Sequence, residues 1–148
     1  MLKKHWISFA LVVLVILFIW DNSLQNDISS DGLSLKMTQW LSPILYKLGL
    51  TGDMWSLNRI VRKMAHVFEF AVLGGCLYVA FHKFNREYAG LKVIFIGLVI
   101  AVMDECLQLA SIGRHASIRD VAIDTAGVII GVAVVQVILS IYRRIRHS

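Results

Sequence analysis

Acidic, basic and histidine side chains gather at three places in an otherwise apolar sequence. At the first place, Arg62, His66 and Glu69 are spaced four and three residues apart, so they share one face of a helix. A carboxylate one turn from a histidine is suited to proton transfer, and an arginine beside them is suited to holding a phosphate group. This helix face is therefore a candidate site for binding or catalysis.

The other two places contribute further carboxylates. Asp104 and Glu105 have Gln108 within one helical turn. Asp120 is followed one turn later by Asp124. The candidate ligand-binding residues are Arg62, His66, Glu69, Asp104, Glu105, Gln108, Arg114, Asp120 and Asp124. The candidates for a catalytic role are His66, Glu69, Asp104 and Glu105. The sequence leaves open whether the protein is an enzyme, identifies no cofactor and assigns no metal site.

The composition excludes an ordinary soluble domain. Of the 148 residues, 57% are hydrophobic and 17% are charged, and the mean hydropathy is +0.69. Soluble domains are about half apolar and about a quarter charged. The net charge of +5 comes mainly from basic residues that flank apolar blocks, so no nucleic-acid partner is indicated. Apolar blocks of this length predict an integral membrane protein.

Four apolar blocks predict an all-α, polytopic membrane protein in a single domain that covers residues 1–148. Its four transmembrane helices are expected at residues 6–20, 62–81, 91–111 and 118–142. The first block is short, about 22 Å as a helix, and Trp6 and Trp20 mark its ends as aromatic residues do at membrane interfaces. No small-residue cleavage site follows it, so we interpret it as an uncleaved anchor.

Between the first two spans, residues 21–32 are polar and turn-like, and residues 33–48 predict an amphipathic helix. Pro43 is expected to kink or divide this helix. One interpretation is that the helix lies in the membrane interface. The other is that it caps the helix bundle and touches lipid little.

Four spans place both termini on one side of the membrane and the three polar places near the other side. Basic residues are denser in the segments on the side of the termini, which favours cytoplasmic termini. Glu69, Glu105 and Asp124 then lie about 9 to 10 Å inside their helices, toward the outer leaflet. Ionisable groups at this depth form either an ion-pair network or a polar pocket, and we favour the pocket.

Some residues near these places also fit structural roles. Asp120 occupies the third helical position of a Ser-x-x-Asp capping box that begins at Ser117. Gly127-x-x-x-Gly131 indicates close packing of two helices. Cys76 and Cys106 lack the spacing of a disulfide framework or a zinc site.

The polar places resemble two motifs of a known family. Arg62-Lys63-x-x-His66-x-x-Glu69-Phe70-x-x-Leu73-Gly74 is similar to the first signature of VanZ-like membrane proteins. Three further segments are similar to the second signature of that family, namely Asp104-Glu105-x-x-Gln108, Gly113-Arg114 and Ser117-x-x-Asp120-x-x-x-Asp124-x-x-Gly127-x-x-x-Gly131. Leu107 stands where many relatives carry histidine, and Ile112 stands where many carry proline. The absence of that histidine weakens the case for a metal centre.

This resemblance implies a small multi-pass protein of the bacterial cell membrane. The founding member of the family lies in a vancomycin-resistance cluster and is associated with low-level resistance to the lipoglycopeptide teicoplanin. The resemblance implies no settled biochemical activity. The expected partner is a membrane lipid or a lipid-linked envelope component.

Three functions fit these residues, and we favour the first. In the first, Arg62, Arg114 and Arg119 hold an envelope lipid or an anionic head group at the outer leaflet, which would alter the access of teicoplanin. The second is an enzyme that acts on such a lipid, with His66 or Glu69 as acid or base and the carboxylates available to a divalent ion. The third is a small proton-coupled transporter.

Overall fold

The computed structural model describes residues 2–24, 27–82, 87–110 and 116–147, and within these residues the chain is helical apart from short turns. The helices are α1 (Leu2–Leu24), α2 (Asp27–Lys47), α3 (Met54–His82), α4 (Ala89–Gln108) and α5 (Ile118–His147). The predicted all-α class is confirmed.

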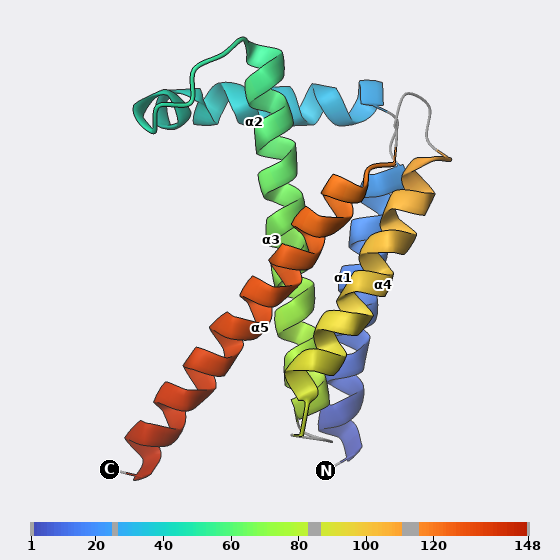
Figure 1. The fold of residues 1–148 in the computed structure, drawn as a ribbon, viewed down its shortest axis with the longest axis vertical. Helices are drawn as coiled ribbons and strands as arrows, with labels where there is room; N and C mark the ends of the chain where they lie inside the picture. The colour runs from blue at the N-terminus through green and yellow to red at the C-terminus, as the bar shows by residue number, and fades with distance from the viewer. Residues whose placement is uncertain (1, 25–26, 83–86, 111–115, 148) are drawn as a thin grey trace.

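Figure 1 shows α3 in the middle of the molecule, with α1 and α4 beside it and α5 crossing it obliquely. Helix α2 lies across the end of the bundle at which α3 begins. Both termini lie at the opposite end. The ends of α1 and α4 and the start of α5 therefore meet near the same level of α3.

Among the described residues, three helices are long and apolar enough to cross a membrane, namely Trp6–Leu24, Met54–His82 and Ile118–Arg146. They contain the spans predicted at residues 6–20, 62–81 and 118–142. Helix α4 has 20 residues, enough for about 30 Å, but it carries Lys92, Asp104 and Glu105. It also ends before residue 111, so the predicted span at 91–111 stays a prediction.

The prediction that residues 21–32 form turns is wrong for most of that segment. Helix α1 continues to Leu24, and α2 starts at Asp27. Ser23 is fully buried, and Asn22 reaches a side chain of α3. Burial and a tertiary hydrogen bond outweigh the local preference of these polar residues for turns.

Helix α2 packs on the first turns of α3 with one face and leaves another apolar face exposed. Leu45 packs against Leu57 and Val61 of α3, and the Thr38 hydroxyl donates a hydrogen bond to Asn58 Oδ1 at 3.0 Å. The exposed apolar face carries Met37, Trp40 and Ile44, and the exposed Leu48 follows directly after the helix. Helix α2 thus caps the bundle, while its contact with a membrane interface stays a prediction.

Pro43 does not divide α2, which continues to Lys47. A proline has no N–H for the carbonyl group four residues earlier, which here belongs to Gln39. The Ser42 hydroxyl donates to that carbonyl oxygen at 2.8 Å. The predicted division is wrong, since the helix continues past Pro43 and a neighbouring hydroxyl satisfies the carbonyl group that the proline leaves without its usual donor.

Glycines let α5 approach the backbone of α3, as the Gly127-x-x-x-Gly131 motif predicts. A Cβ atom at Gly127 would lie 2.6 Å from the Val67 carbonyl oxygen, and one at Gly131 would overlap the Ala71 carbonyl group. Only glycine allows this distance between helix axes. The approach brings the start of α5 against the middle of α3, where the polar residues lie.

Candidate functional site

A hydrogen bond between α1 and α3 holds Glu69 in place. Asn22 Nδ2 donates to Glu69 Oε1 at 2.9 Å, across 47 residues of sequence. Asn22 is not among the predicted site residues, because residues 21–32 were expected to form turns. The only signal in the sequence was its position two residues after Trp20, where the first apolar block ends.

His66 lies one helical turn from Glu69 on α3. The distance from His66 Nδ1 to Glu69 Oε2 is 3.6 Å, and the two side chains are 22% and 16% exposed. The pair is thus close enough to interact electrostatically and largely shielded from solvent. Such a pair is able to pass a proton or to orient the imidazole ring.

Asp104 of α4 is fully buried, and its two oxygens have different surroundings. Gln108 Nε2 donates a hydrogen bond to Asp104 Oδ2 at 3.1 Å. Oδ1 accepts no hydrogen bond from the described part of the chain. A buried carboxylate oxygen in this condition is uncommon, because its desolvation is not compensated.

Asp124 of α5 joins this group from a third helix and is 2% exposed. One potential ligand atom from each of His66, Asp104 and Asp124 lies within 4.8 Å of the other two. We call these three residues together with Glu69 the polar cluster. The structure brings them together although they come from three separate predicted spans.

Glu105 and Asp120 connect helices outside the polar cluster. Glu105 Oε2 accepts a hydrogen bond from the Ser117 N–H at 2.7 Å, which ties α4 to the start of α5. Asp120 forms an ion pair with Lys63 of α3. The predicted capping box is therefore wrong, because Glu105 accepts the hydrogen bond from the Ser117 N–H group that Asp120 was expected to accept.

The basic residues lie at the rim of the site. Arg62 is half-buried, Arg119 is exposed, and the Lys63 side chain is 47% exposed. Arg114 lies outside the described residues. Positive charge thus borders the polar cluster on the side of α2.

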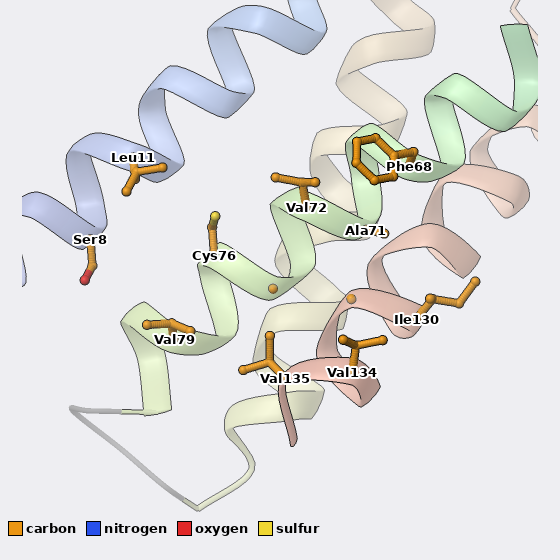
Figure 2. Close-up of a pocket in the computed structure, with 12 residues that line it drawn as sticks. Ser8, Leu11, Phe68, Ala71, Val72, Cys76, Val79, Ile130, Val134 and Val135 are labelled. Atoms are coloured by element: carbon orange, nitrogen blue, oxygen red, sulfur yellow. The ribbon is translucent and has the colours of Figure 1, made fainter. Parts of the chain in front are cut away.

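An apolar cleft between α1 and α3 ends at the polar cluster. It encloses about 410 Å³, and its lining is Leu14, Val15, Phe18, Ala65, Phe68, Glu69 and Val72. A second cleft of about 570 Å³ lies between α1, α3 and α5 and shares Phe68 and Val72 with the first. Figure 2 shows the apolar side chains of α3 that follow one another along it, from Phe68 to Val79. We call the two clefts together the apolar groove.

The comparisons with known proteins give one match. No curated protein and no solved structure matches the chain. The model of the VanZ/LLP1 family matches residues 6–139, nearly the whole chain, and the protein therefore belongs to the VanZ/LLP1 family.

Proposed function

We propose that this protein binds a lipid of the cell envelope, with the acyl chain in the apolar groove and the head group at the polar cluster. The observation that carries the proposal is the shape and chemistry of the groove. It is apolar along its length, and a carboxylate, Glu69, stands at one end. An amphiphilic molecule matches this arrangement.

The length of the groove fits one acyl chain. Along α3 it extends from Glu69 to Val79, which is about 15 Å of helix. The apolar core of a bilayer is about 30 Å thick, so the groove covers about half of that thickness, from the depth of Glu69 toward the end of the bundle at which α3 ends. Because the groove lies between helices that are apolar enough to cross a membrane, a lipid is the ligand best placed to enter it.

Two kinds of polar group surround the expected head-group position. Arg62 and Arg119 are suited to a phosphate oxygen, since guanidinium groups bind phosphate through paired hydrogen bonds. The carboxylates of Glu69 and Asp124 accept hydrogen bonds from hydroxyl or amine groups. This supports a phospholipid or a lipid-linked intermediate that also carries hydroxyl or amine groups.

We place the protein in the bacterial cell membrane with four spans and with both termini in the cytoplasm. The position of the two termini at one end of the bundle supports an even number of spans. The polar cluster then faces the outer leaflet. An acylated glycopeptide such as teicoplanin inserts its chain in that layer, so a lipid head group held at the polar cluster would alter its access to the membrane.

A matched pair of bulky substitutions tests the proposal. Val72→Trp fills both clefts, and Val102→Trp adds the same bulk on α4 outside them. Val72 and Val102 are 39% and 46% exposed, so both helices have room for the larger side chain. Filling the groove removes contacts with at least two methylene groups of a bound chain, at about 0.8 kcal/mol each.

The measurement is native mass spectrometry of lipids that co-purify with each variant, followed by titration with a spin-labelled phospholipid. We expect about a tenfold weaker binding for Val72→Trp and no change for Val102→Trp. Equal lipid retention by the two variants would contradict the proposal. Teicoplanin susceptibility of cells that carry each variant tests the effect on drug access separately.

The His66–Glu69 pair supports a second candidate function, an enzyme that modifies the bound lipid. Its 3.6 Å separation next to the groove places an acid–base pair beside the expected head group. Lipid extracts from cells with the wild-type chain and with Glu69→Gln would then differ in one lipid species. Identical extracts together with intact lipid binding would leave binding as the function.

A further inference from the structure

We propose that His66, Asp104 and Asp124 form a binding site for a divalent transition-metal ion, Zn²⁺ or Mn²⁺. The three residues come from α3, α4 and α5, and their potential ligand atoms lie within 4.8 Å of one another. The sequence does not show this site, because the ligands belong to three helices and no two of them form a known metal-binding motif.

The donor set matches this class of ion. One imidazole nitrogen and two carboxylate oxygens suit Zn²⁺ or Mn²⁺ better than Mg²⁺ or Ca²⁺, which prefer oxygen ligands alone. Ligand bonds of about 2.1 Å place neighbouring ligand atoms about 3 to 4 Å apart. Small side-chain movements are sufficient to reach this geometry from the observed separations. Three protein ligands also leave a coordination position open for water or for a ligand.

The carboxylate of Asp104 shows the arrangement that a metal ligand needs. Its Oδ2 is held by Gln108 Nε2 at 3.1 Å, while its fully buried Oδ1 accepts no hydrogen bond from the residues that the structure describes. A coordinated ion would compensate the desolvation of Oδ1. Gln108 would then orient the ligand from the outer shell, as hydrogen-bonded carboxylates in metal sites are oriented.

His66 has the corresponding support on its own helix. Its Nδ1 lies 3.6 Å from Glu69 Oε2, and Glu69 is itself fixed by Asn22. Histidine ligands commonly turn one ring nitrogen to a carboxylate and bind the metal through the other. In this arrangement one imidazole nitrogen of His66 is the ligand atom, and Glu69 is a positioning residue.

The charges of the two aspartates are a further reason to expect a bound cation. Asp104 and Asp124 are 0% and 2% exposed, and two buried carboxylates at this distance repel each other unless a cation or a shared proton lies between them. A divalent ion neutralises both at once. The shared proton is the competing explanation, and it predicts no metal affinity.

The experiment uses the full chain in detergent micelles, stripped with a chelator and freed of added lipid, so that it does not depend on lipid binding. Mn²⁺ is titrated and followed by electron paramagnetic resonance, and Zn²⁺ is added to displace it. We expect one Mn²⁺ per chain, displaced by Zn²⁺, and at least about tenfold weaker binding in Asp104→Asn and Asp124→Asn. Asp21→Asn, the same substitution at an exposed residue of α1, is the matched control and keeps wild-type affinity.

A second measurement needs no variant and is unaffected if an asparagine variant fails to fold. Pulsed paramagnetic resonance of wild-type protein with bound Mn²⁺ is expected to show coupling to an imidazole nitrogen. The proposal is overturned if the wild type binds no Mn²⁺ or Zn²⁺ at millimolar concentration. It is also overturned if nitrogen coupling is absent, or if both folded asparagine variants bind as tightly as the control.

Discussion

Gly127→Ala tests whether the contact of α3 and α5 determines the stability of the bundle. The new Cβ atom would lie 2.6 Å from the Val67 carbonyl oxygen and 3.1 Å from Phe70 Cβ. Ordinary carbon–oxygen contacts start at about 3.3 Å, so the helices must separate by about 0.7 Å at this point. The oxygen belongs to the backbone and is unable to rotate away. Overpacking of this kind costs about 1 to 3 kcal/mol in the free energy of unfolding.

The matched control is Gly32→Ala, the same substitution in α2. A Cβ atom at Gly32 has no other atom within 4 Å, so alanine there stabilises the helix by about 0.5 to 1 kcal/mol through reduced backbone entropy. We would measure the unfolding of both variants in detergent micelles by tryptophan fluorescence. If Gly127→Ala unfolds at the same denaturant concentration as Gly32→Ala, or at a higher one, the close approach of α3 and α5 is not the stabilising feature that the structure indicates.

The remaining predictions concern the ends of α3 and α1. The Ser56 hydroxyl and backbone N–H bind the Asp53 carboxylate at the start of α3 and lower its pKa below 3.8. The contribution of the charged group is therefore present above that pH and is lost as the pH falls through the lowered pKa. The advantage in stability of the wild type over Asp53→Asn is expected to disappear in acid unfolding experiments below about pH 4, and a pH-independent difference would contradict it. Asn22→Ala leaves the partly buried Glu69 Oε1 without its donor, so the unfolding free energy is expected to fall by about 1 to 3 kcal/mol. Unchanged unfolding, set against Asp21→Ala at an exposed residue of α1 as a control, would show that this bond is not important.

The fold was predictable to the extent that hydropathy determines it. Apolar blocks predict helices because each block must satisfy its own backbone hydrogen bonds in an apolar surrounding. The glycine motif also predicts that α5 packs closely on another helix, because small residues are the requirement for that distance, but the structure alone shows that the partner is α3. The continuity of α2 through Pro43 was not predictable by the same rules, since hydropathy does not show local contacts such as the hydrogen bond from the Ser42 hydroxyl to the Gln39 carbonyl oxygen.

The depth of the site residues in the membrane was predictable, but the contacts between their side chains were not. Counting residues along each span places Glu69 and Asp124 at similar depth, and the structure brings their helices together. Hydropathy does not show which side chains meet, because that depends on the rotation of each helix about its axis. The partners of Asn22 and Lys63 are therefore found only in the structure.

The attachment of α2 to α3 has a consequence for where the polar cluster lies in a bilayer. The bond between Thr38 and Asn58 is buried and fixes the two helices to each other. His66 follows Asn58 by eight residues, or about 12 Å along α3. If the exposed face around Trp40 rests at the membrane surface, α2 fixes the depth of α3, and His66 lies about 12 Å below that surface. The cluster would then keep the same depth in thin and thick bilayers, and differences in thickness would be taken up at the far end, where both termini lie.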